Sequence, residues 1–322
     1  MASIPEVPLN SGSRPIPLVG MGTATYPFAT ENTKQAILHA LELGYRHFDT
    51  ASVYRSEQPL GEAIAEALQR GLVKSRAELF ITSKLWCSDA HREHVLPALH
   101  RSLQNLQLDY LDLYLIHFPM SFKPGLLTVP VNEEDILPFD LKSVWEAMEE
   151  CQKLGLVRSI GVSNFTRRKL EELLRFALIP PAVNQVEMNP VWQQKKLREF
   201  CKEKGIHVTA YSPIGGQDSQ GSRNLVMASE VLKEIAKARG KTVAQVSLRW
   251  VYEQGVSMVV KSFNKERLEE NIKFFDWKLS EEQCQKICQI PQCKKISVQA
   301  LVSFKESSKS HDLSDVDIIE EE

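Results

Sequence analysis

Four residues of this sequence could together place a proton on an oxygen atom: Asp49, Tyr54, Lys84 and His117. A free tyrosine, with a pKa of about 10, is a poor proton donor at neutral pH. A lysine ammonium beside it favours the phenolate and is expected to lower that pKa toward the working range, while an aspartate keeps the lysine charged and oriented. A histidine can direct a substrate oxygen to the tyrosine. This chemistry suits the reduction of a carbonyl, for which a cofactor must supply the hydride, because no side chain can.

Each of the four residues also has an ordinary structural explanation. Alone, Asp49 is more often a helix cap or an ion-pair partner, and Tyr54 a half-buried aromatic residue. A lysine at a strand end, such as Lys84, is usually solvated, and His117 is more often a satisfied polar side chain. Their joint placement at the ends of predicted strands favours an enzyme. By itself the placement also fits a Schiff-base lyase that uses Lys84, or a metal-dependent hydrolase.

The metal interpretation is the weakest of these. His47 and Asp49 do not form a paired-histidine ligand motif. Cys284, Cys288 and Cys293 have a suggestive spacing, but no histidine lies nearby, and the first two are one helical turn apart. We therefore predict no metal site and interpret these cysteines as reduced thiols of a cytoplasmic protein.

The elements that must position these residues alternate regularly along the chain. Short runs rich in β-branched or aromatic residues are each followed by a segment with helical periodicity. The eight runs are Leu18–Thr23, Arg46–Thr50, Leu79–Lys84, Leu111–His117, Ser159–Asn164, Ala182–Glu187, His207–Ser212 and Met258–Ser262. Glycines follow the predicted helices at Gly44, Gly71, Gly155, Gly205 and Gly255, where a left-handed cap costs little.

Eight strand–helix alternations predict an α/β fold, a (β/α)8 TIM barrel. A doubly wound sheet is the alternative, but Gly20-Met-Gly22-Thr23 lacks the third glycine of its phosphate-binding fingerprint. We expect one barrel domain over residues 1–322, with a core of about 9–291 and a tail of 292–322. Long loops are predicted at Ser121–Phe139 and Pro213–Ala228, on the C-terminal face that carries barrel active sites, and the tail is expected to be irregular.

A ring of polar residues is predicted on that face. Its members, in strand order, are Thr23, Asp49 with Tyr54, Lys84, His117, Ser163 with Asn164, Gln185 with Glu187, Tyr211 with Ser212, and Lys261 with Ser262. Packing alone does not explain a ring of acid, phenol, amine, imidazole and amide groups.

The composition limits the classes of partner. Hydrophobic residues make up 43% of the chain, charged residues 25%, and the formal net charge is −2, which gives no electrostatic reason to expect nucleic acid or an anionic membrane. No apolar run approaches the roughly 18 residues of a membrane span. Residues 1–12 show no signal-peptide or transit-peptide pattern, so a cytoplasmic monomer acting on a small molecule is expected.

Six segments resemble the signatures of the aldo-keto reductase family, in the family's order, from about Leu9 to Pro291. They are Gly44-Tyr-Arg-His-Phe-Asp49-Thr-Ala with Tyr54, Asp112-Leu-Tyr-Leu-Ile-His117-Phe-Pro, Ile160-Gly-Val-Ser-Asn164-Phe, Val183-Asn-Gln185-Val-Glu-Met-Asn-Pro190, Tyr211-Ser-Pro213, and Val260-Lys261-Ser-Phe-Asn264 with Arg267. Segments such as Glu78-Leu-Phe-Ile-Thr-Ser-Lys84-Leu-Trp-Cys87 are similar to the family's plant branch, which includes codeinone reductase, methylecgonone reductase, chalcone reductase and deoxymugineic acid synthase.

The resemblance implies a role for each residue of the first set. Tyr54 would be the general acid and Lys84 would lower its pKa. Asp49 would anchor Lys84, and His117 would orient the carbonyl. A non-catalytic barrel that binds nucleotide as a sensor or channel-associated subunit, which the family also contains, remains an alternative.

The resemblance also implies NADPH as the cofactor. Residues assigned to the nicotinamide are Ser163, Asn164, Gln185 and Tyr211, and those assigned to the pyrophosphate are Ser212 and Ile214. Gly22 and Thr23 are also expected to bind the cofactor. Lys261, Ser262, Phe263, Asn264 and Arg267 would bind the 2′-phosphate, and Glu270 and Asn271 the adenine. Two cations flanking a small hydroxyl suit a phosphate monoester, which favours NADPH over NADH.

The substrate side departs from a common pattern of the family. Members that act on aldehydes and sugars often carry tryptophan where this chain has Ala24 and Phe118, whereas Trp86 is kept. Replacing two indoles with smaller groups should widen the pocket and favour a bulky ketone. The expected substrate-binding residues are Ala24, Pro27, Trp86, Phe118, Leu126 and Leu127.

Overall fold

Eight parallel strands form a closed barrel in the computed structural model, which describes residues 4–25, 30–216, 223–295 and 301–303. The barrel strands are β3 (Val19–Gly22), β4 (His47–Asp49), β5 (Phe80–Leu85), β6 (Leu111–Ile116), β10 (Val157–Ser163), β11 (Val183–Glu187), β12 (His207–Tyr211) and β13 (Ser257–Val260). Each pairs with the next along the chain, and β13 closes the ring on β3. All eight lie within the predicted runs or extend them by one or two residues, so the (β/α)8 prediction is confirmed.

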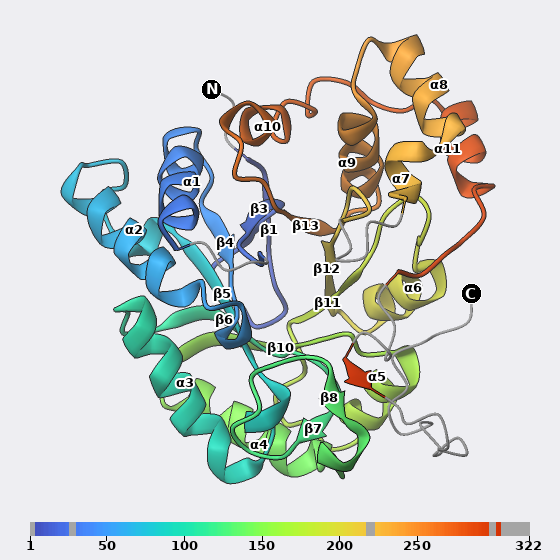
Figure 1. Cartoon of the computed structure of the whole chain (residues 1–322). Helices are drawn as coiled ribbons and strands as arrows, with labels where there is room; N and C mark the ends of the chain where they lie inside the picture. Colours follow the sequence, from blue (N-terminus) through green and yellow to red (C-terminus); the bar gives the residue numbers. More distant parts are fainter. Residues whose placement is uncertain (1–3, 26–29, 217–222, 296–300, 304–322) are drawn as a thin grey trace.

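Helices surround the strands on the outside (Figure 1). They are α1 (Thr30–Glu42), α2 (Glu57–Gln69), α3 (Arg92–Leu106), α4 (Leu141–Lys153), α5 (Arg167–Leu174), α6 (Lys195–Glu203), α7 (Leu225–Ala228), α8 (Glu230–Arg239), α9 (Val243–Glu253), α10 (Lys265–Glu270) and α11 (Glu281–Cys288). Four short 3-10 helices are η1 (Ser52–Tyr54), η2 (Arg76–Glu78), η3 (Cys87–Asp89) and η4 (Glu133–Asp135).

Local sequence signals explain where several helices begin and end. Thr242 and Ser280 form capping boxes with the side chains of Gln245 and Gln283, at the starts of α9 and α11. The helices before β4 and β10 are followed by glycines in the left-handed region, with φ of 96° at Gly44 and 76° at Gly155. These signals fix where the helices begin and end.

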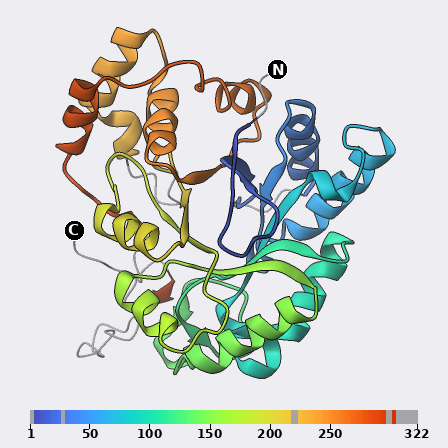
Figure 2. The ribbon, with the colours of Figure 1, turned by 180° about the vertical axis from the view of Figure 1, so that it is seen from behind.

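Several short elements lie where the sequence predicted loops or made no prediction. The N-terminal strands β1 (Glu6–Val7) and β2 (Ile16–Pro17) form an antiparallel pair, and the blue N-terminal segment lies in front of the barrel in Figure 2. The stretch Ser121–Phe139 contains β7 (Ser121–Phe122), β8 (Val131–Asn132) and β9 (Ile136–Leu137), and Pro213–Ala228 ends in helix α7.

The expectation of an irregular tail was wrong at one point. Strand β14 (Val302–Ser303) pairs in parallel with β8. A two-residue strand has no periodicity to read, and its partner is far away in the sequence. Only the folded structure brings the two segments together.

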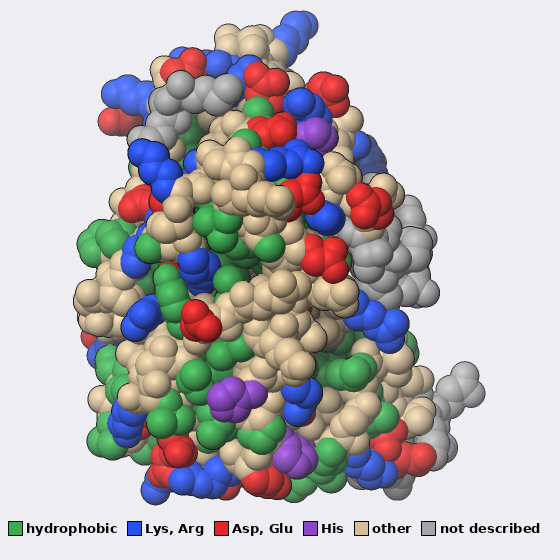
Figure 3. All heavy atoms as spheres, turned by 90° about the vertical axis from the view of Figure 1, so that its left-hand side faces the viewer, with side chains coloured by type: hydrophobic (Ala, Val, Ile, Leu, Met, Phe, Trp, Pro, Cys, Tyr) green, Lys and Arg blue, Asp and Glu red, His purple; other side chains and the backbone are tan. Residues whose placement is uncertain are grey.

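On one side of the molecule the charged side chains do not form a patch of a single sign. Figure 3 shows acidic and basic side chains interspersed over the side formed by α1, α2 and α3. Within the described residues, no helix has the length and apolar character needed to cross a membrane.

His47 is buried and His207 half-buried at the end of the barrel where the strands begin. Nδ1 of His47 lies 3.3 Å from the carbonyl oxygen of Pro17. Nε2 of His207 accepts a hydrogen bond from the backbone N–H of Ser257 at 3.1 Å, so this nitrogen carries no proton. Burial lowers the pKa of each histidine to about 4, from an ordinary value of 6.5. Both imidazoles are therefore neutral in the folded protein.

We expect this pair to make the fold sensitive to acid. Because the folded-state pKa values are depressed, the contribution to stability is complete above pH 6.5 and is lost as the pH falls toward about 4. The unfolding free energy of the wild type, measured in urea, should fall between pH 8 and pH 5, and this fall should be smaller in His207→Gln. Over the full titration of His207 the difference amounts to up to roughly 3 kcal/mol. The same change at exposed His100 should leave the wild-type pH dependence intact. Identical slopes for His207→Gln and wild type would contradict the assignment.

Candidate active site

The structure brings the four predicted proton-transfer residues to one rim of the barrel. Asp49 is the last residue of β4, and Lys84 lies near the end of β5. Tyr54 is carried by η1, and His117 directly follows β6. Because β4, β5 and β6 are hydrogen-bonded neighbours, their C-terminal ends converge although the residues are distant in sequence.

Asp49 and Lys84 form a buried ion pair. The Lys84 ammonium donates to Asp49 Oδ1 at 2.6 Å and to the Thr50 carbonyl oxygen at 3.0 Å, and the other carboxylate oxygen accepts from Gln185 Nε2 at 2.8 Å. Only 1% of Lys84 and 3% of Asp49 is exposed. Burial disfavours the ammonium, but the Asp49 carboxylate and the Tyr54 phenol outweigh it and raise the pKa of Lys84. The lysine therefore stays charged.

Tyr54 and His117 lie together above this pair. The phenol oxygen is 3.1 Å from His117 Nε2, and the Lys84 ammonium is 4.8 Å from the centre of the phenol ring. Burial, reinforced by the Lys84 charge, holds the pKa of His117 well below its ordinary value. The imidazole is therefore neutral and can hydrogen-bond an uncharged oxygen.

The expected direction of the Tyr54 shift needs correction. Lys84 does act to lower the pKa of the phenol, but burial acts the other way and is stronger, so the pKa of Tyr54 is raised. The hydroxyl thus keeps its proton at neutral pH. The nearby ammonium favours the phenolate only once the proton has left.

A chain of buried hydroxyls holds the segment that carries Tyr54. Ser56 Oγ lies 2.7 Å from Thr23 Oγ1 and 2.7 Å from Thr50 Oγ1. Thr23 Oγ1 also donates to the Asp49 carbonyl oxygen at 2.9 Å. Thr23, predicted as a cofactor residue, is fully buried, and its hydroxyl makes these two contacts within the rim. Ser56 was missed, although it lies two residues beyond the phenol in the same motif.

The predicted amide cluster is also assembled. Asn164 has φ of 62°, and its Nδ2 donates to Ser163 Oγ at 3.1 Å and to the His117 carbonyl oxygen at 2.9 Å. Its Oδ1 accepts from the Tyr211 hydroxyl at 2.7 Å. Gln185 uses its Nε2 on Asp49, which leaves its side-chain carbonyl for an incoming donor. The cluster thus joins the proton-transfer residues on one side and Tyr211 on the other.

A tight turn follows β12. Ser212, Gly215 and Gly216 lie in the left-handed region, with φ of 50°, 82° and 58°, and the Gly215 N–H donates to the Ser212 carbonyl oxygen at 2.9 Å. Ile214 packs against the core. A glycine turn of this kind lets an anion approach the backbone closely, and N–H groups in a turn can form an anion-binding concavity.

The residues predicted to bind a phosphate monoester lie after β13. Lys261, Asn264 and Arg267 are exposed. Ser262 Oγ donates to the Asn264 carbonyl oxygen at 3.3 Å and accepts from its N–H at 3.2 Å, which holds the turn. Phe263 is half-buried against the core. The end of β3 lies beside this turn, because a Cβ at Gly22 would be 3.8 Å from Lys261 Cβ.

Glu270 and Asn271 differ from this exposed group. Glu270 accepts a hydrogen bond from Thr242 Oγ1, and Asn271 is only 3% exposed at the end of α10. Both side chains are therefore less accessible to a nucleotide than the side chains of Lys261 and Arg267.

An apolar wall stands beside His117. We define it by Trp86, Phe118, Met120, Phe122, Val131, Leu301 and Val302, which form one buried cluster with Leu126 packed against it. Trp86 meets His117 edge-on with ring centres 5.2 Å apart, and its Nε1 donates to the Leu126 carbonyl oxygen at 2.9 Å.

The remaining predicted substrate residues differ in exposure. Ala24 is exposed at the end of the first barrel strand, and Leu127 is 48% exposed. Pro27 lies outside the described residues.

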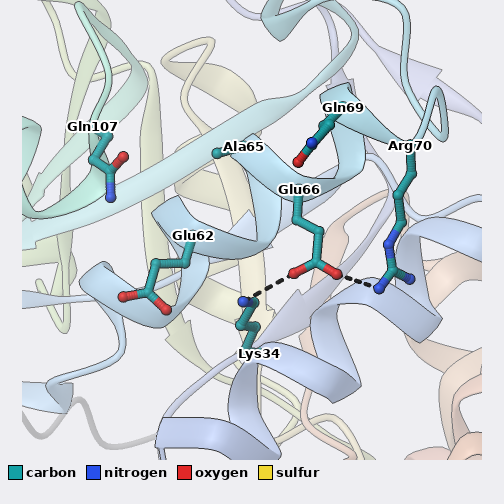
Figure 4. Close-up of a pocket in the computed structure, with 7 residues that line it drawn as sticks. All are labelled: Lys34, Glu62, Ala65, Glu66, Gln69, Arg70 and Gln107. Atoms are coloured by element: carbon teal, nitrogen blue, oxygen red, sulfur yellow. Dashed lines mark ion pairs between the residues drawn. The ribbon is translucent and has the colours of Figure 1, made fainter.

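A hollow of about 620 Å³ between α1 and α2 is not a rival site. Lys34 and Arg70 both point to Glu66, and the Lys34–Glu66 pair measures 2.9 Å (Figure 4). Its charges neutralise each other on the outside of the barrel. Among the described residues no group of three potential ligands could hold a metal, and Cys288 and Cys293 are exposed.

Comparisons with known proteins point to one family. The model of the aldo/keto reductase family matches residues 18–291. The chain is 63% identical to the (1S)-1,7-diacetoxy-luvungin A aldo-keto reductase of Citrus sinensis over 301 residues, 94% of each protein. It is 59% identical to an NADPH-dependent codeinone reductase of Papaver somniferum, covering 93% of this chain and 94% of the relative. An aldo-keto reductase of Bombyx mori in complex with NADP superimposes with a TM-score of 0.84 at 38% identity, covering 93% of this chain and 97% of that one.

Proposed function

The chain belongs to the aldo/keto reductase family, and from this premise we propose that it reduces a bulky, uncharged ketone of plant specialised metabolism to the alcohol, with Tyr54 as proton donor. As a member of this family it is an oxidoreductase that uses NADP(H). The observation that carries the proposal is the contact of 3.1 Å between the Tyr54 hydroxyl and His117 Nε2, above the buried Lys84–Asp49 pair.

The proposed proton transfer follows from the charges at the rim. NADPH, when bound, supplies the hydride that reaches the carbonyl carbon. Neutral His117 and protonated Tyr54 both present hydrogen-bond donors to the carbonyl oxygen. The Tyr54 proton moves to that oxygen as negative charge builds on it. The phenolate left behind faces the Lys84 ammonium, which stabilises it until solvent returns a proton.

The residues present fit the cofactor. Asn164, Ser163 and the carbonyl of Gln185 match the donors and acceptor of a carboxamide, and Tyr211 offers an aromatic face beside them. The left-handed turn with Ser212 and Ile214 suits the pyrophosphate. Lys261 and Arg267 are exposed cations flanking Ser262, a combination that suits the 2′-phosphate. We assign Gly22, Phe263, Asn264, Glu270 and Asn271 to the same cofactor-binding site.

The apolar wall supports a large, uncharged substrate. The wall itself is buried, and it carries no charge that could pair with a carboxylate or an amine. Leu126, which packs against it, is half-buried, and Leu127 is 48% exposed, so these two offer apolar contact area. The small side chain of Ala24 at the rim leaves room beside it. Apolar walls of this kind bind ligands mainly through the area they bury.

We also propose that the enzyme acts as a cytoplasmic monomer. One chain supplies Asp49, Tyr54, Lys84 and His117, so no partner is needed to complete the rim. All six cysteines are free, which suits a reducing compartment. The test of the whole proposal is NADPH consumption by purified protein with a panel of alkaloid, terpenoid and polyketide ketones. NADPH binding without turnover of any of them would favour a non-catalytic nucleotide-binding barrel.

Tyr54→Phe should abolish reduction while leaving NADPH affinity nearly unchanged. The hydroxyl acts on the substrate oxygen, and loss of a general acid typically costs about a hundredfold or more in rate. Single-turnover oxidation of bound NADPH measures the chemical step, and fluorescence titration measures binding. A mutant that keeps a tenth of the rate would show that another group donates the proton.

Arg267→Ala should weaken NADPH binding roughly ten- to a hundredfold, because one charge-assisted contact contributes about 1.5–3 kcal/mol. NADH lacks the 2′-phosphate, so its affinity should hardly change. Titrations of the two nucleotides against wild type and variant provide the comparison. An equal loss for both would mean that Arg267 supports the fold.

Ala24→Trp should change substrate choice rather than catalytic competence. An indole at this exposed rim position would fill space beside the carbonyl, and steric overlap costs about 1–3 kcal/mol. The ratio of kcat/KM for a polycyclic ketone to that for a small aromatic aldehyde should fall roughly ten- to a hundredfold. A parallel loss for both substrates would instead indicate a distorted rim, and no change would place residue 24 outside the pocket.

A further inference from the structure

The C-terminal tail is fastened to the rim directly after α11. The Cys293 N–H donates to the Val191 carbonyl oxygen at 2.7 Å, and Gln292 Oε1 accepts from the Gln193 N–H at 2.6 Å. The Lys295 N–H then points to the buried Glu187 carboxylate, 3.2 Å from Oε2. Figure 1 shows this segment in red, running from α11 to the region of α6. Residues 292–295 are therefore held against the segment that follows β11.

This anchoring brings the Lys295 side chain to the glycine turn after β12. The half-buried ammonium donates to the carbonyl oxygens of Gly216 at 3.2 Å and Gly215 at 3.4 Å. We propose that Lys295 is a positioning residue for the cofactor: it fixes the turn Ile214–Gly216 in the conformation that receives the pyrophosphate. The inference rests on the proposed function, because that function places the pyrophosphate at this turn.

Peptide geometry gives the physical reason. In a trans peptide the carbonyl oxygen and the following N–H point in opposite directions. When the ammonium holds the Gly215 carbonyl, it also sets the direction of the Gly216 N–H. Both glycines have positive φ and no side chain, so without an external hold the turn can adopt many conformations. Ordering it beforehand removes an entropic cost from nucleotide binding.

A second side chain also binds carbonyl oxygens of this turn. Asn224 Nδ2 donates to the Ile214 carbonyl oxygen at 2.9 Å and to the Gly216 carbonyl oxygen at 3.1 Å. Asn224 also caps α7, so its replacement would disturb a helix as well. Lys295 caps no helix. Replacing Lys295 is therefore expected to loosen the turn without disturbing a helix.

The experiment compares Lys295→Met with Lys295→Arg and with Lys278→Met, a matched control at an exposed lysine after α10. NADPH and NADH affinities are measured by fluorescence titration. Amide hydrogen exchange of the peptide covering residues 211–216 is measured without nucleotide. We expect Lys295→Met to weaken both nucleotides by about tenfold and to speed exchange in this peptide. Lys295→Arg should restore most of the affinity, and Lys278→Met should match wild type.

Three outcomes would overturn the inference. Unchanged affinity with unchanged exchange would show that the turn does not need Lys295. A loss confined to NADPH would place Lys295 at the 2′-phosphate, as predicted for Arg267. Faster exchange throughout the protein, with a lowered Tm, would make the effect one of global stability. If wild-type protein bound neither nucleotide, the proposed function itself would fail, which this design separates from a failure of Lys295 alone.

Discussion

The ion pair between Lys84 and Asp49 is the interaction on which the site depends. Two opposite charges that are almost fully buried must be paired and hydrogen-bonded, because each alone would be very costly. The pair satisfies this condition with the help of Thr50 and Gln185, which make further hydrogen bonds to it. The pair also affects its neighbours. The Lys84 charge adds to the effect of burial in keeping His117 neutral, and it places a fixed positive charge where a phenolate would form.

The pair also resolves an apparent conflict in the properties of Tyr54. A proton donor should hold its proton before the reaction and release it readily during the reaction. Burial provides the first property and the Lys84 charge the second. The sequence suggested only the lysine effect, because residue types show which charges are present but not how much water surrounds them. Residue types were enough to propose Tyr54 as the acid, whereas the balance of the two effects on its pKa required the fold.

The same distinction separates what else the sequence could and could not reveal. The eight barrel strands and the capping boxes of α9 and α11 were predicted because their signals are local and periodic. Strands β1, β8 and β14 were not, since each has two residues and is defined by a partner elsewhere. Thr23 and Ser56 illustrate this within the site. Their hydroxyls contact each other and the residues at the end of β4, and these contacts became visible only in the fold.

The pairing of β14 with β8 has a consequence for the order in which the molecule is completed. The last barrel strand ends at Val260, so every strand of the barrel has been synthesised before the ribosome reaches the tail. The apolar wall, in contrast, needs Leu301 and Val302 beside Val131. A nascent chain can thus close its barrel and form the Lys84–Asp49 pair before the apolar wall is complete. Changes in the tail's part of this wall can therefore accumulate without passing through the folding of the barrel, so the shape of the wall can vary while the barrel and its ion pair stay the same.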